Sequence, residues 1–198
     1  MADLTFKGTT QLALTQIGVG GKIDANTKVT LTDNLYTIAD LAAIIGVATA
    51  NKIKLEKTAA SVAFENDYAT INPVLAGVEK YTGPVTLTDA GGVNATNLNT
   101  IAAATSGKVT ATLTSVAVAP SLVTALEDVK ATDNITFTAA AGTLGDNSDV
   151  RALISLSKIL PKANFSAITS VTTSEVSLAK QAIAIIKNNT NLAVDLST

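Results

Sequence analysis

The sequence predicts an α/β fold in which short strands and helices alternate along a right-handed solenoid, with a parallel sheet on one side and helices on the other. A strand-like phrase recurs along the chain at intervals of 24 to 32 residues, and a helical segment follows each of its first seven copies. Apolar residues make up 47% of the chain but aromatic residues only 4%, which suits thin, regularly stacked layers. These observations predict a single solenoid domain over residues 1–198, with about seven to eight coils.

Eight segments have the alternating apolar and polar residues of a short strand. They are LTFK from Leu4, KVTLTD from Lys28, KIKLEK from Lys52, PVTLTD from Pro84, KVTATLTS from Lys108, NITFTA from Asn134, NFSAIT from Asn164 and NLAVDLS from Asn191. Their alignment makes equivalent the positions Leu4, Val29, Ile53, Val85, Val109, Ile135, Phe165 and Leu192. Because successive strand side chains point to opposite faces, we expect Val85 and Leu87 to face the core and Thr86 and Thr88 to face solvent.

A segment with apolar residues three and four positions apart, the spacing of an amphipathic helix, lies between each pair of successive strands. In chain order these segments are 9–19, 37–49, 67–81, 94–105, 119–132, 147–160 and 174–189. Asp67, Asn94, Ser148 and Ser174 lie at the starts of four of them and are candidate N-caps. Parallel strands need a long crossover between them, and these helices supply it.

An open, doubly wound α/β sheet is the alternative fold, because it also alternates strands and helices. Its strands are covered on both faces and therefore read as nearly continuous apolar runs. Here the strands alternate, the units are short and the phrase repeats. These features favour the solenoid.

The stretch VTLTDAGGVNATNLNTIAAATSGKVTATLTS, residues 85–115, and its weaker copies cover nearly the whole chain. They resemble leucine-rich-repeat-like β/α solenoids. More narrowly, they are similar to the Ala-, Thr- and Asn-rich strand–helix repeats of large bacterial, often cyanobacterial, surface proteins. The resemblance implies an extracellular or cell-surface location.

The composition argues against several classes of function. The chain has no Cys and no His, so it has no thiolate or imidazole chemistry, no disulfide and no Ser-His-Asp triad. A formal net charge of -2 with scattered lysines argues against nucleic acid as a partner. No apolar run is long enough for a membrane span, and the N-terminal residues lack the pattern of a signal peptide. We expect no enzyme activity and no cofactor.

The segment GDNSD is the best candidate for a metal site, with oxygen ligands on Asp146, Asn147 and Asp149. Clustered hard oxygen donors suit Ca²⁺, but the segment lacks the closing Glu and the ligand spacing of an EF-hand. The favoured interpretation is therefore an N-cap for the helix that follows.

Outward threonines recur in four of the predicted strands, as Thr30/Thr32, Thr86/Thr88, Thr110/Thr112 and Thr136/Thr138. Stacked in register, they would form a Thr-x-Thr ladder of the kind that ice-binding solenoids present. The ordinary β-propensity of Thr is the simpler explanation. Ice binding is accordingly a minor alternative.

Strand-like phrases at both ends of the chain place apolar side chains on predicted edge strands: Leu4, Phe6, Leu192, Val194 and Leu196. Such an edge is a template for another strand, from a second copy or from neighbouring repeats of a longer chain. With the resemblance to bacterial surface repeats, these edges predict a non-catalytic structural module of a bacterial surface layer, filament, sheath or large adhesin that associates end to end. A protein- or ligand-binding solenoid is the alternative.

Overall fold

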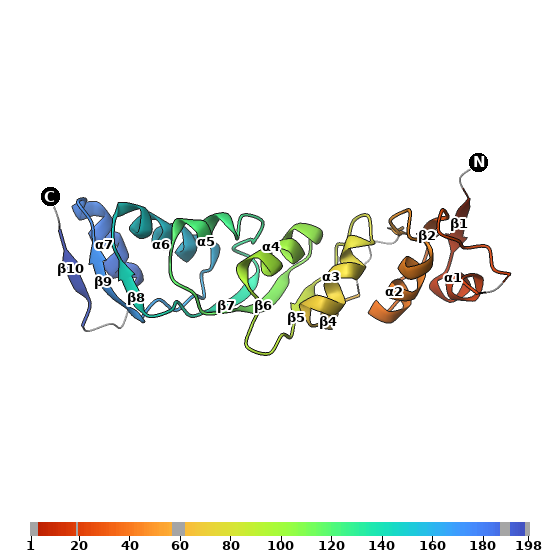
Figure 1. The fold of residues 1–198 in the computed structure, drawn as a ribbon, viewed down its shortest axis with the longest axis horizontal. Helices are drawn as coiled ribbons and strands as arrows, with labels where there is room; N and C mark the ends of the chain where they lie inside the picture. Colours follow the sequence, from red (N-terminus) through yellow and green to blue (C-terminus); the bar gives the residue numbers. More distant parts are fainter. Residues whose placement is uncertain (1–3, 19, 57–61, 187–190, 197–198) are drawn as a thin grey trace. The chain divides into compact units, whose positions relative to one another are not determined.

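The computed structural model describes residues 4–18, 20–56, 62–186 and 191–196 (Figure 1). In these residues the fold is mixed α/β, with three parallel sheets and seven α-helices. In chain order the elements are β1 (Thr5–Gly8), α1 (Thr10–Gln16), β2 (Lys28–Leu31), α2 (Ile38–Val47), β3 (Lys54–Leu55), β4 (Phe64–Asn66), α3 (Tyr68–Ala76), β5 (Val85–Leu87), α4 (Ala95–Ala104), β6 (Val109–Leu113), α5 (Pro120–Thr124), β7 (Asn134–Phe137), β8 (Gly142–Leu144), α6 (Asn147–Ile159), β9 (Ile168–Thr172), α7 (Val176–Ile185) and β10 (Ala193–Asp195).

The chain groups into two compact units. One unit comprises Met1–Thr88 with Ile101–Val109, and the other comprises Asp89–Thr100 with Thr110–Thr198. The three sheets have the strand orders β1-β2-β3, β4-β5-β6-β7 and β8-β9-β10, so within each sheet the order of the strands follows the sequence. All the described strand pairs are parallel, which confirms the predicted α/β class.

The paired residues correct the predicted alignment of the repeats. Thr30 pairs with Lys54, which agrees with the predicted equivalence of Val29 and Ile53. However, Phe6 and not Leu4 lies opposite Val29, and Ala111 and not Val109 lies opposite Ile135. Each error is a slip of two residues. A slip of two keeps every side chain on its own face, so the alternating pattern cannot detect it.

Two further strand predictions are wrong in position. The alignment missed β4, because it took the step from Ile53 to Val85 as one long interval, whereas Ile53 pairs with Val78 and Phe64 pairs with Val85. The last internal strand, β9, begins at Ile168, four residues later than the predicted start. Asn164 instead makes an isolated parallel bridge to Thr138.

The predicted faces of the strands are confirmed. In β5, Val85 and Leu87 are buried, Thr86 is half-buried and Thr88 is exposed. The same alternation holds in β2, β6 and β7. Burial of one face of these four strands stabilises them, because they are too short to be stable alone.

Side-chain caps define several helix starts. Asp67 caps α3, and its carboxylate accepts a hydrogen bond of 2.8 Å from the backbone N–H of Thr70, as predicted. Asn94 accepts a bond from the N–H of Asn97 at the start of α4. The other two predicted caps are wrong, because Asp146 caps α6 and Glu175 occupies the cap position of α7. None of the helices in the described residues is both long and apolar enough to cross a membrane.

Candidate functional site

The GDNSD segment forms a helix cap. One carboxylate oxygen of Asp146 accepts bonds from the N–H of Ser148, the N–H of Asp149 and the hydroxyl of Ser148, at 2.7, 3.0 and 2.6 Å. These bonds satisfy backbone donors in the first turn of α6 that have no partner within the helix. They favour the ionised carboxylate, so the pKa of Asp146 lies below its usual value.

The other two candidate ligands have protein partners. Asn147 accepts a bond of 2.5 Å from the hydroxyl of Thr173, and Asp149 accepts a bond of 3.1 Å from the N–H of Gly145. Across the described residues, no group of three or more carboxylates is arranged to hold a metal ion. Asp146, Asn147 and Asp149 therefore form a capped helix start whose side chains are held by hydrogen bonds to neighbouring residues.

The cap predicts a pH-dependent effect of Asp146→Ala. The folded-state pKa of Asp146 is lowered, so the carboxylate stabilises the fold above its unfolded-state pKa of about 4, and this contribution disappears as the pH falls through the folded-state value. The variant should therefore melt below wild type at pH 7, and the difference should shrink in acid. Thermal melts across this range measure it.

Glu127→Ala is the matched control, because Glu127 is exposed and makes no described hydrogen bond. Its melting temperature should follow wild type at every pH. An ion that binds the native state must raise the melting temperature. Because we assign the segment as a cap and not as an ion site, millimolar Ca²⁺ should leave the melting temperatures of the wild type and both variants unchanged. A Ca²⁺-dependent rise that is present in wild type and lost in Asp146→Ala would contradict the assignment as a cap.

Charged and amide side chains interrupt the predicted threonine ladder. Thr30 pairs with Lys7 on one side and Lys54 on the other, and Thr86 pairs with Glu65. Lys7 and Glu56 form a salt bridge of 2.6 Å on the sheet β1-β2-β3. Thr112 pairs with Thr136, but Thr110 pairs with Asn134. The outward face of these strands is a mixed polar surface.

The predicted assembly residues lie on edge strands of their sheets or directly beside them. β1 is the first strand of β1-β2-β3, and β10 is the last of β8-β9-β10. The side chains of Leu4, Val194 and Leu196 are exposed, and those of Phe6 and Leu192 are half-buried. These residues form two apolar edges, because no further strand of their own sheets pairs with the outer side of β1 or of β10.

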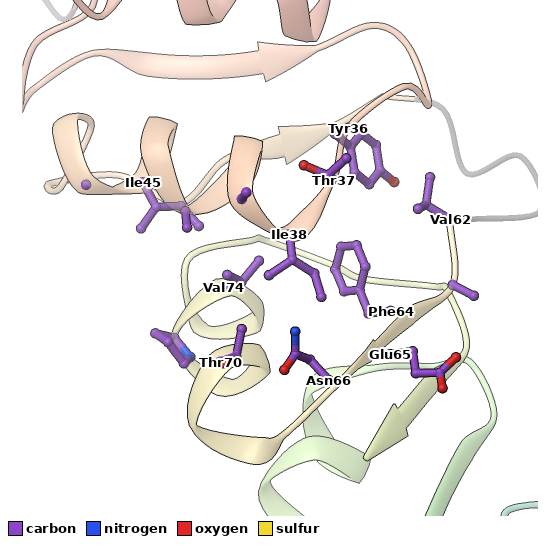
Figure 2. A pocket seen from close by; sticks show the side chains of 15 residues that line it. Tyr36, Thr37, Ile38, Ile45, Val62, Phe64, Glu65, Asn66, Thr70 and Val74 are labelled. Atoms are coloured by element: carbon purple, nitrogen blue, oxygen red, sulfur yellow. The ribbon is translucent and has the colours of Figure 1, made fainter. Parts of the chain in front are cut away.

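A groove lies between α2 and α3 in the first unit. It has a volume of about 690 Å³. Figure 2 shows Ile38 and Ile45 of α2 on one wall, Thr70 and Val74 of α3 on the other, and Phe64 of β4 at one end. Ala42, Gly46 and Pro73 complete the apolar walls. We call this feature the α2–α3 groove.

Three aromatic rings form the end of the α2–α3 groove and the core beneath it. Phe64 stacks on Tyr81 with ring centroids 4.5 Å apart and meets Tyr36 edge to face at 6.4 Å. The hydroxyl of Tyr81 donates a hydrogen bond to the carbonyl of Val62. Burial raises the pKa of both tyrosines above the usual value, so both hydroxyls are uncharged at neutral pH.

No sequence pattern predicted the α2–α3 groove. One signal was available, because the interval from Ile53 to Val85 is the longest in the alignment and marks a place where the repeat is irregular. The structure places β3, β4 and α3 in that interval. Comparison of the chain with family models, with curated proteins and with solved structures finds no match.

Proposed function

We propose that this chain is a non-catalytic structural module, built as a right-handed β/α solenoid, that joins coils of its own kind end to end in a bacterial surface layer, filament, sheath or large adhesin. The observation that carries the proposal is a pair of open apolar edges, at β1 and at β10. An extracellular or cell-surface location belongs to the same proposal.

The strand pairing supports the solenoid. Paired residues differ in number by 20 (Val93 with Leu113) to 27 (Thr143 with Ser170), and within each sheet the strands lie in the order of the sequence. The interval from Phe64 to its partner Val85, for example, holds the strand β4, the helix α3 and a return, which is the content of one coil. A doubly wound sheet reverses its strand order at a switch point, and none of the three described sheets does so.

A comparison of two valines supports the open edge at β10. Val194 pairs with Val171 in the adjacent strand β9, so both side chains lie on the inward face of the sheet. Val171 is 0% exposed, whereas Val194 is 39% exposed. The two positions differ in their neighbours. The strand β9 has a neighbouring strand on each side, whereas β10 has a neighbouring strand on one side only. An added coil would bury Val194 as β10 buries Val171.

The exposed apolar side chains concentrate beside these two edges. Of the eight large apolar side chains that are exposed in the described residues, six belong to β1, α1, α7, β10 or the residues next to them: Leu4, Leu12, Val176, Ile183, Val194 and Leu196. Val176 and Ile183 are seven residues apart and therefore lie on one face of α7. Both the strand layer and the helix layer are thus open at the edge formed by α7 and β10.

The backbone of the edge strands is suited to parallel addition. The N–H of Thr173 donates to the carbonyl of Asp195, so the neighbouring Val194 directs its backbone groups to the other edge of β10. At the two ends of β1, the carbonyls of Leu4 and Gly8 accept bonds from the N–H groups of Lys28 and Thr32, so Thr5 and Lys7 direct their backbone groups to the outer edge. A β1 strand from another copy could pair with β10 as β10 pairs with β9. This contact is heterologous, and repeated without closure it builds a filament.

The variant Val194→Lys tests the proposal. We expect the mass of the wild-type particle, measured by sedimentation or light scattering, to rise from low to high micromolar protein. Val194→Lys should remain monomeric, because a buried, unpaired ammonium group opposes the contact. Ala193→Lys adds the same charge one residue away on the outward face and should still assemble. A wild type that is monomeric at every concentration, or an equal loss of assembly in both variants, would contradict the proposal.

The α2–α3 groove favours a second candidate function, the binding of a ligand by the same module. A concave, mainly apolar site with a few polar groups is the usual form of a small-molecule site, and such sites span roughly 300–1,000 Å³. The groove lies within that range.

A further inference from the structure

We propose that the α2–α3 groove binds a neutral, elongated, mainly apolar molecule that carries one hydrogen-bond acceptor. The inference is independent of end-to-end assembly, because the residues that line the groove, from Tyr36 to Val74, lie outside the strands β1 and β10.

The shape of the groove favours an elongated ligand. At the C-terminal ends of the two helices, Ile45 lies so close to Gly77 that a Cβ atom built on Gly77 would come within 2.6 Å of the Ile45 side chain. Towards the start of α2, Ile38 faces the space between the helices, with Phe64 beside it (Figure 2). The groove therefore runs along α2, from the contact of Ile45 with Gly77 to the ring of Phe64.

The polar side chains in the lining are mostly occupied by helix caps. The hydroxyl of Thr37 donates a hydrogen bond to the carboxylate of Asp40 at 2.8 Å. The oxygen of this hydroxyl also accepts a hydrogen bond from the backbone N–H of Asp40, as part of a capping box. Thr70 hydrogen-bonds to Asp67, the cap of α3. Because these groups already have partners, the walls of the groove offer a ligand apolar contact and few hydrogen bonds.

Asn66 is the exception. Its carboxamide oxygen accepts the N–H of Asp67 at 2.9 Å, and its side chain points into the groove (Figure 2). Its Nδ2 group makes no hydrogen bond to another described residue, so this donor can serve a ligand acceptor such as a hydroxyl, ether or carbonyl oxygen. One such bond would orient an otherwise apolar molecule.

The charge around the groove disfavours an anionic ligand. None of the described residues that line it is Lys or Arg, and Glu65 is the charged residue at its rim. The two tyrosine hydroxyls near Phe64 are uncharged at neutral pH. A carboxylate head group would lose its hydration here without gaining a cation, whereas an alcohol of the same chain length would not meet that cost.

Binding of the neutral dye Nile red, followed by its fluorescence, tests the inference. We expect saturable binding to the wild type, with competition by decanol and little competition by decanoate. Ala42→Phe should weaken binding by about tenfold or more, because Ala42 lines the groove and a phenyl ring there occupies it. Ala43→Phe is the control. Ala43 is also exposed on α2 but does not line the groove, so affinity should stay within about twofold of wild type.

A second filling variant guards against misfolding. Gly46→Leu places a side chain where a Cβ meets no atom within 4 Å, and it replaces a glycine in a helix with a better helix former. It should keep or raise the melting temperature and still weaken dye binding. Equal dye binding by wild type, Ala42→Phe and Gly46→Leu would overturn the inference, as would competition by decanoate as strong as that by decanol. Unchanged binding in Val194→Lys would separate the groove from the apolar edges.

Discussion

The substitution Leu87→Asp should destabilise the protein severely, by about 3–5 kcal/mol, and should lower its melting temperature by roughly 10 °C or more. Leu87 lies on the inward face of β5, 7% exposed, and pairs with Asn66 of β4. A carboxylate at this position would lie on the buried, apolar face of β5 and would be largely removed from water. Such a group loses its hydration without gaining a counter-charge.

Thr88→Ala is the matched control for this prediction. Thr88 is the next residue, it is exposed, and the hydrogen bond from its backbone N–H to the carbonyl of Asn66 does not depend on its side chain. Its free energy of unfolding should change by no more than about 0.5 kcal/mol. Chemical and thermal denaturation of both variants give the comparison. In addition, the loss in free energy of unfolding caused by Leu87→Asp should become smaller in acid, because protonation removes the buried charge. Equal losses in the two variants would mean that the faces of β5 are assigned wrongly.

The substitution Gly107→Ala should destabilise the protein by about 1–3 kcal/mol or more, although it adds a single methyl group. A Cβ atom on Gly107 would overlap the backbone of Gly83, and it would lie 2.8 Å from the nitrogen of Pro84. Neither neighbour is a flexible side chain that can rotate away. The buried hydroxyl of Thr105 ties this contact together, since it donates to the carbonyl of Gly83 at 2.8 Å and accepts the N–H of Gly107 at 2.9 Å.

Gly142→Ala tests whether this loss is specific to the close contact. Gly142 lies in β8, has an ordinary backbone conformation, and a Cβ atom there would meet nothing within 4 Å. Alanine should be tolerated, or should slightly stabilise the protein by restricting the unfolded chain. The melting temperatures of the two variants should move apart. A Gly107→Ala variant that melts with wild type would show that the backbones of Gly83 and Gly107 can separate at little cost.

The sequence alone determined the features that depend on local order. The alternation in β5 placed Val85 and Leu87 inside and Thr88 outside, and the structure confirms this. The recurrence of strand and helix led to the α/β class with parallel strands, and Asp67 was identified as a cap from its place before an apolar helical run. These features follow from the two-residue period of a strand, the 3.6-residue period of a helix and the preference of short polar side chains for helix starts.

Only the tertiary structure decided the register, the interrupted repeat and the α2–α3 groove. A slip of two residues between β1 and β2 leaves every side chain on its own face, so the choice of Phe6 opposite Val29 depends on tertiary packing. The strand β4 has the sequence FEN, in which one apolar residue is followed by two polar ones, so no alternation is visible. The α2–α3 groove exists because α2 and α3 meet where Gly77 lets Ile45 approach and enclose a space beside Phe64. Residues that are distant in the sequence create that space together, and no local pattern in either helix encodes it.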